Sequence, residues 1–156
     1  MSTLEQVYQK FGFVAEAAQL LETQLGTMLL LSSGAEQGWF IEPDAKRATE
    51  FHDNINRSTL GQLIKRMQST PLALSAVETL LSDALRERNR LFHSFYRQHN
   101  FRRNSEEGRA VMWSDLDSIH ETLLRAYKAV MLIDGVDLDA LATSGEYNPP
   151  TGHVDI

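Results

Sequence analysis

Apolar residues recur at three- and four-residue steps along three long segments of this 156-residue chain. The first segment covers residues 3–32, the second covers 72–99, and the third opens near Ser105 or Ser114 and stops at Gly135. This spacing places the apolar side chains on one face of an α-helix. No stretch alternates apolar and polar residues convincingly, and no internal repeat is visible. The sequence therefore predicts an all-α fold, in which four to five amphipathic helices bury their apolar faces in a bundle.

Two shorter helices are expected between the first two long segments. Asp44 precedes AKRATEFHDNIN and Ser58 precedes TLGQLIKRMQ, and both residue types are favourable N-caps. Gly34 is expected to follow the end of the first long helix, and Pro71 suits the beginning of the next one. These signals divide the chain into helices joined by short loops.

Length and composition indicate one domain that needs no covalent cross-link. A chain of 156 residues can bury its own core, and the absence of cysteine excludes thiol catalysis, disulfides and thiolate metal sites. We place a helical bundle at residues 1–135 and a short helical turn with a loosely ordered tail at residues 136–156. The N-terminal MSTLEQVYQK does not resemble a leader, and the longest strongly apolar run, MLLL at residues 28–31, is too short to cross a bilayer. A cytoplasmic protein without membrane association is expected.

Positive charge is concentrated in one part of an acidic chain. The net charge is −6, but residues 86–103 contain six arginines and one acid, which gives this segment a charge of +5 and leaves −11 for the rest. The arginines are Arg86, Arg88, Arg90, Arg97, Arg102 and Arg103. Such segregation is typical of a protein that grips a phosphate chain at one place. The alternative is that these arginines pair with acids from elsewhere in the chain.

Arg88 and His93, in the stretch RNRLFH, supply two groups that suit RNA cleavage without a metal or cofactor. An imidazole can take the proton from a ribose 2′-hydroxyl that attacks phosphorus, and a guanidinium can donate to the oxygens where charge develops. Asn89 could orient either group. Residues five apart on an ideal helix point about 140° apart. The two groups can therefore act on one phosphate only if the helix ends or kinks near them, or if a second copy of the chain completes the site.

Other histidines carry weaker signals. Arg47 and His52 repeat the same spacing in RATEFH, but an alanine replaces the amide and the helix is weakly amphipathic, so we interpret this pair as a solvated face. His120 lacks the second histidine of a zinc-protease helix, and His52 has no partner at metal-ligand spacing, so no metal site is expected. His99 is expected to extend the basic patch.

The RNRLFH stretch, the leucine-rich helix before it and the segment TLGQLIKRM together resemble HEPN domains. These are small helical bundles common in bacterial toxin–antitoxin and defence systems. The resemblance covers residues 4–133, and its specific part is Arg88 with Asn89 and His93. It implies a metal-independent endoribonuclease that acts as a homodimer, with Arg88 and His93 as the catalytic pair and Asn89 as polar support.

The remaining site residues follow from the basic segment around this motif. Arg86, Arg90, Arg97, Arg102, Arg103 and Tyr96 are expected to contact RNA. One HEPN toxin subgroup places a tyrosine two positions after the histidine, whereas this chain has Phe95 there and Tyr96 next to it. Many HEPN proteins are not nucleases, so a non-catalytic module that binds a nucleotide, RNA or a protein partner, such as an antitoxin or regulatory subunit, is the alternative. A purely structural bundle is a third possibility.

Overall fold

The computed structural model describes residues 2–70 and 74–145, and its regular elements in these ranges are all helical. They are α1 (Leu4–Glu36), α2 (Ala45–Asn56), α3 (Leu60–Gln68), the 3-10 turn η1 (Leu74–Val77), α4 (Glu78–His93), α5 (Phe95–Gln98), the 3-10 turn η2 (Arg102–Asn104), α6 (Glu106–Ile133) and α7 (Leu138–Ser144). The predicted all-α class is confirmed. The expected helix start at Pro71 and the tail from residue 146 lie outside the described residues.

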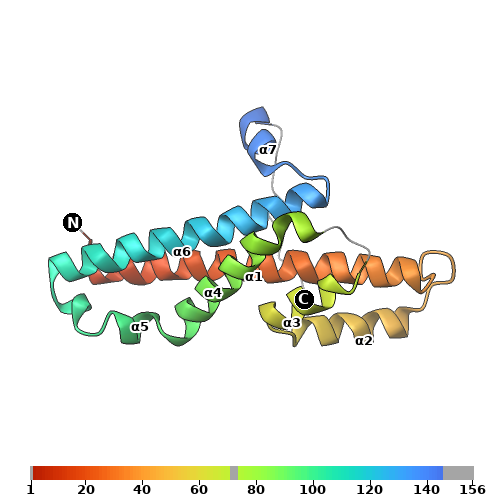
Figure 1. Ribbon diagram of the computed structural model, residues 1–156, viewed down its shortest axis with the longest axis horizontal. Helices are drawn as coiled ribbons and strands as arrows, with labels where there is room; N and C mark the ends of the chain where they lie inside the picture. Colours follow the sequence, from red (N-terminus) through yellow and green to blue (C-terminus); the bar gives the residue numbers. More distant parts are fainter. Residues whose placement is uncertain (1, 71–73, 146–156) are drawn as a thin grey trace.

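Helices α1 and α6 lie side by side along the bundle and run in the same direction (Figure 1). Their contacts fix this parallel register, because Arg109 Nε donates to the Ser2 carbonyl at 2.7 Å and Gln24 Nε2 donates to Asp134 Oδ2 at 2.9 Å. Helix α4 packs against α6 and α1 and runs from the C-terminal half of α1 toward its N-terminal half. Helices α2 and α3 lie along the C-terminal half of α1 (Figure 1). Helix α7 projects from the end of α6.

The core consists of the apolar faces predicted from the sequence. Fully buried residues include Leu21 and Leu25 on α1, Leu81 on α4, and Ile119 and Leu123 on α6. Burying such a side chain stabilises the fold by about 1.5–3 kcal/mol. The hydrophobic stripes of the three longest helices therefore meet in one continuous core, and this packing sets which residues of α4 remain outside.

Two expected helix boundaries were wrong. Helix α1 continues past Gly34 to Glu36, because Gly34 is buried where a Cβ would lie 3.2 Å from Cε3 of the Trp39 ring. The glycine makes room for the following loop instead of ending the helix. Helix α3 is capped by Thr59 and not by Ser58: the Thr59 hydroxyl accepts the Gln62 N–H, and Gln62 Oε1 accepts the Thr59 N–H at 2.9 Å.

The segment expected to run as one helix over residues 72–99 is divided in three. A 3-10 turn precedes α4, and α4 ends at His93, because Ser94 leaves the helical conformation with φ −133° and ψ −18° before α5 begins at Phe95. The helix therefore ends at the histidine of the RNRLFH motif.

Turn η2 packs directly on the first turn of α6, and Gly108 makes this approach possible. A Cβ on Gly108 would lie 2.1 Å from the Arg102 carbonyl oxygen. We expect Gly108→Ala to lower the free energy of unfolding by about 1–3 kcal/mol, because backbone cannot yield as a side chain does. Urea denaturation measures this. Gly12→Ala is the control, since no atom lies within 4 Å of its Cβ position and alanine there should stabilise α1 by up to about 1 kcal/mol. Equal stability of the Gly108→Ala and unaltered proteins would contradict the prediction.

Candidate functional site

The last turns of α4 present the motif residues along one side of the helix. With about 100° between successive residues, Phe92, Asn89 and His93 lie about 40°, 100° and 140° around the helix axis from Arg88. Phe92, Asn89 and His93 are exposed, and the Arg88 side chain is 18% exposed. We call these four residues the motif arc. No contact between the Arg88 and His93 side chains occurs in the described part of the chain.

Arg88 is held in one orientation by neighbours on three sides. Its Nε donates to Glu22 Oε1 on α1 at 3.0 Å, and its Nη1 donates to Asn89 Oδ1 at 3.3 Å. The guanidinium also lies 4.9 Å from the centre of the Phe92 ring, a cation–π contact. Its Nη2 has no hydrogen-bond partner among residues 2–70 and 74–145. Glu22 thus fixes the guanidinium plane and lowers the local positive charge.

His93 is the least constrained member of the motif arc. It is the last residue of α4, and its ring makes no hydrogen bond within the described ranges, although its backbone carbonyl accepts from Arg97 Nη2 at 2.7 Å. An exposed imidazole without a protein partner can exchange protons with a bound molecule. Helix α4 ends only after His93, so Arg88 and His93 both lie within its regular turns.

A partly buried ion-pair network lies between α4, α6 and the residue that follows α5. Asp115 on α6 accepts two hydrogen bonds from Arg90, both at 2.7 Å, and one from His99 Nε2 at 2.6 Å. The Arg90 guanidinium is the main reason that the pKa of Asp115 is lowered, with a smaller contribution from His99. The carboxylate in turn raises the pKa of Arg90, which also pairs with Glu87 at 2.8 Å. This network ties the end of α4 to α6.

His99 does not extend the basic patch, contrary to the prediction from sequence. It is only 4% exposed, with its ring 4.5 Å from that of Phe95. Arg102 Nη1 lies 2.9 Å from His99 Nδ1. Because a guanidinium can only donate, Nδ1 must accept, and the proton of this neutral imidazole must sit on Nε2, facing Asp115. His99 therefore links Arg102 to the network and is not available to a ligand.

Folding changes the charge of the arginine-rich segment. Arg88 pairs with Glu22, Arg86 with Asp83 at 3.2 Å, and Arg90 with Asp115. These three carboxylates come from outside residues 86–103 and lower its charge from +5 to +2. Within the described residues, no carboxylate pairs with the remaining arginines, which are Arg97 on α5 and Arg102 and Arg103 on η2. The charge still available to a phosphate chain therefore lies beyond the motif arc, at the α5–η2 end.

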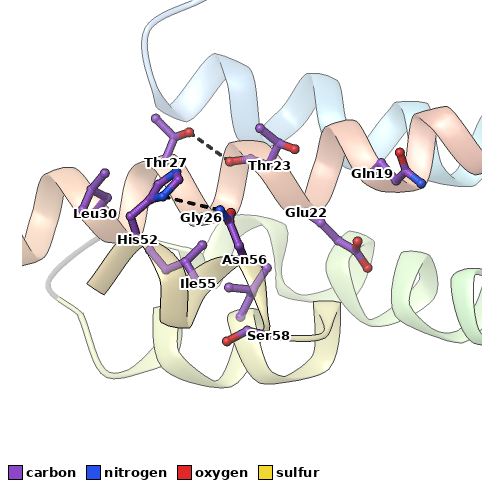
Figure 2. A pocket seen from close by; sticks show the side chains of 11 residues that line it. Gln19, Glu22, Thr23, Gly26, Thr27, Leu30, His52, Ile55, Asn56 and Ser58 are labelled. Carbon is purple, nitrogen blue, oxygen red and sulfur yellow. Dashed lines mark hydrogen bonds between the residues drawn. The ribbon is translucent and has the colours of Figure 1, made fainter. Parts of the chain in front are cut away.

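A pocket of about 280 Å³ with a mixed polar and apolar lining lies between α1, α2 and α3 (Figure 2). Thr23, Thr27, His52 and Asn56 line it, and His52 Nδ1 lies 3.4 Å from Asn56 Nδ2. Glu22 stands at its edge, pointing away from His52, and it is the same carboxylate that holds Arg88. The pocket could not be predicted because it depends on how α2 lies across α1.

Arg47 and His52, which repeat the spacing of Arg88 and His93, lie in different surroundings. Arg47 is 67% exposed and pairs with Asp44, as expected for a solvated face, whereas His52 lines the pocket. No group of three or more histidine, aspartate or glutamate residues in the described ranges could hold a metal ion. None of the helices in those ranges is long and apolar enough to span a membrane.

Comparison with known proteins adds no identity. No family model, no curated protein and no solved structure matches this chain. The resemblance to HEPN domains therefore rests on the residue pattern alone, and the function must be argued from the site.

Proposed function

We propose that this chain is a metal-independent endoribonuclease of the HEPN type, active as a homodimer in the cytoplasm, in a bacterial toxin–antitoxin or phage-defence role. The observation that carries the proposal is the geometry of α4. The helix ends at His93, which leaves an exposed imidazole without a side-chain partner in the described residues, about 140° around the helix axis from a guanidinium held by Glu22 and Asn89. A free proton carrier and a fixed oxyanion donor, brought to one phosphate by a second copy of the chain, suit phosphodiester cleavage.

The proposed reaction needs only groups that this chain supplies. The ribose 2′-oxygen attacks the adjacent phosphorus, and the bond from phosphorus to the 5′-oxygen breaks. His93 takes the 2′-hydroxyl proton while Arg88 donates to the oxygens that gain charge. The products are a 2′,3′-cyclic phosphate and a 5′-hydroxyl. Asn89 holds Arg88 and is not itself required to transfer a proton.

A second imidazole is needed to protonate the leaving 5′-oxygen, and this is the reason for proposing a dimer. His99 is buried and bonded on both ring nitrogens, so it cannot serve. His52 lies in the pocket between α1 and α2. We therefore propose the partner's His93, brought to the same phosphate by a two-fold axis, as the second imidazole.

The decisive experiment is an RNA cleavage assay with the purified full chain. We expect a mixed-sequence single-stranded RNA to be cut equally well whether or not a chelator is present in about 10-fold excess over divalent ions. The fragments should carry 2′,3′-cyclic phosphate ends. Mass spectrometry of the fragments identifies these ends. Loss of cleavage on adding chelator, or 3′-hydroxyl ends, would exclude this mechanism.

One observation favours a non-catalytic role instead. Arg88 is already ion-paired with Glu22, and within residues 86–103 the arginines that pair with no carboxylate of the described chain are Arg97, Arg102 and Arg103. A module that binds RNA, a nucleotide or an acidic protein partner without cleaving it would use these three. RNA that binds but stays intact, with binding lost when the three arginines are replaced by glutamine, would support this alternative.

A further inference from the structure

Aromatic side chains from three helices gather beside the motif arc. Tyr8 on α1, Phe92 on α4 and Tyr96 on α5 are 45%, 40% and 42% exposed. The rings of Tyr8 and Tyr96 are 6.2 Å apart, and the Phe11 ring beneath them lies 5.3 Å from Tyr96 and 6.5 Å from Phe92. We call Tyr8, Phe92 and Tyr96 the aromatic platform. Single exposed aromatic residues are ordinary, but here Tyr8 contacts Tyr96 and Phe92 is linked to Tyr96 through Phe11, so the three half-exposed rings form one candidate binding surface.

Two arginines and a histidine lie next to the residues of this platform. Arg88 stacks on Phe92, His93 follows Phe92 in the chain, and Arg97 follows Tyr96 without a carboxylate partner in the described residues. Burial is the main reason that the pKa of Tyr96 is raised, so its phenol remains neutral at physiological pH and can donate to a phosphate. Rings for base faces beside cations for phosphates are the groups by which proteins bind single-stranded nucleic acid.

We propose that the aromatic platform stacks unpaired nucleobases, and that the ligand of this protein is single-stranded RNA. The base next to the scissile phosphate would lie on Phe92 and Tyr96, which brings its sugar to the exposed His93. A duplex cannot bind in this way, because its base faces are already stacked on each other. This inference deepens the proposed function and rests on it for the identity of the nucleic acid.

A second copy of the chain is the other occupant that such a surface could have. A two-fold contact would place the platform of one copy against the platform of the other. Arg88 and Arg97 would then lie close to the same two arginines of the second copy. Arg97 has no carboxylate partner in the described part of the chain, so a self-contact would bury like charges. RNA supplies the negative charge that this surface lacks. The proposed dimer must therefore meet beside the platform and leave it open.

The test uses a strand that cannot be cleaved, so that binding is measured apart from catalysis. A fluorescent 2′-O-methyl RNA of 12 nucleotides is titrated with the full chain and followed by anisotropy, alongside a hairpin of the same composition. We expect Tyr8→Ala with Tyr96→Ala to weaken single-strand binding by about 10- to 100-fold, since stacking contributes substantially for each base. Tyr8→Phe with Tyr96→Phe should keep most of the affinity, because the rings remain.

Phe13→Ala provides the matched control. Phe13 is also on α1 and is 52% exposed, but it makes no ring contact with the platform in the described structure. Its replacement should leave binding unchanged. Equal binding of hairpin and single strand, or full affinity in the double alanine variant, would overturn the proposal. A dimeric wild type that becomes monomeric in that variant would instead assign the surface to self-association and also overturn it.

A second measurement avoids dependence on folding of the alanine variants. The unaltered chain is labelled with 3-fluorotyrosine, and its resonances are assigned with single Tyr→Phe changes. Adding the 2′-O-methyl strand should shift the resonances of Tyr8 and Tyr96 but not that of Tyr127, which packs against the core. Unchanged Tyr8 and Tyr96 signals at saturating RNA would refute the platform. Platform binding without cleavage of ordinary RNA would reject the nuclease while leaving the platform in place.

Discussion

Replacing His93 with alanine is expected to lower kcat/KM for RNA cleavage by about 10²- to 10⁴-fold, the usual contribution of a general acid or base. In the proposed homodimer one substitution removes both the base and the acid, so the upper part of this range is expected. The fold should be unaffected, because the His93 ring is exposed and makes no hydrogen bond within the described residues. Thermal unfolding should therefore give a change within about 0.5 kcal/mol. This separation of activity from stability makes His93 a sharper test than Arg88, whose removal also leaves Glu22 unpaired.

His52→Ala is the matched control for that substitution. Arg47 and His52 have the same spacing as Arg88 and His93, but His52 lies in the pocket between α1 and α2. Cleavage by this variant should equal that of the unaltered protein. Cleavage that survives His93→Ala would remove the nuclease assignment, and cleavage lost in His52→Ala would move the active site to the pocket.

Asp115→Asn is expected to lower the free energy of unfolding by about 2–3 kcal/mol. Breaking a buried ion pair from one side costs about 3–5 kcal/mol, and the partial exposure of Asp115 and Arg90, at 22% and 25%, reduces this value. Asparagine also has only one side-chain oxygen, so Arg90 and His99 would have to share a single acceptor. Urea denaturation at neutral pH measures the loss. Asp117→Asn is the control, because Asp117 pairs with Lys10 while 46% exposed and should contribute less than about 1 kcal/mol.

The pH dependence of stability provides an independent check on the same residue. The pKa of Asp115 in the folded protein is below its ordinary value, mainly through Arg90. A carboxylate of this kind stabilises the fold above its unfolded pKa of 3.8, and that contribution is lost as the pH falls from there toward the lower folded pKa. We expect the urea midpoint of the unaltered protein to fall more steeply below about pH 4 than that of Asp115→Asn. Parallel curves would show that Asp115 does not carry this contribution.

Much of the fold follows from the spacing of apolar residues and from helix-capping residues. The two wrong helix boundaries also have causes that can be traced to single residues. The apolar spacing of residues 3–32 predicts the buried face of α1, and Asp44 caps α2 as expected because its side chain accepts the Arg47 N–H at 3.0 Å. Gly34 was misread as a stop because glycine also serves where another segment packs closely. Ser58 is the better cap by residue type, but the capping-box spacing from Thr59 to Gln62 is the sequence signal that identifies Thr59.

The candidate site was predictable only in part. Arg88, Asn89 and His93 lie in the last two turns of α4, and the angle of about 140° between Arg88 and His93 is retained because the helix ends only after His93. Their catalytic role stays a prediction. Glu22 and Asp115 carry no signal in the sequence, because they are 66 and 25 positions from the arginines that they bind. A charge count along the chain therefore overstated the free positive charge of residues 86–103.

By itself, the sequence determined the helical class, the core faces of α1, α4 and α6, and the presence of an imidazole and a guanidinium on one short segment, since periodicity and composition are local properties. The tertiary structure alone decided which arginines stay free of carboxylates, that His99 is buried while His93 is exposed, and that Tyr8 joins Phe92 and Tyr96. Each of these depends on contacts between segments far apart in the chain, where burial and Coulomb energy are set by distance in space.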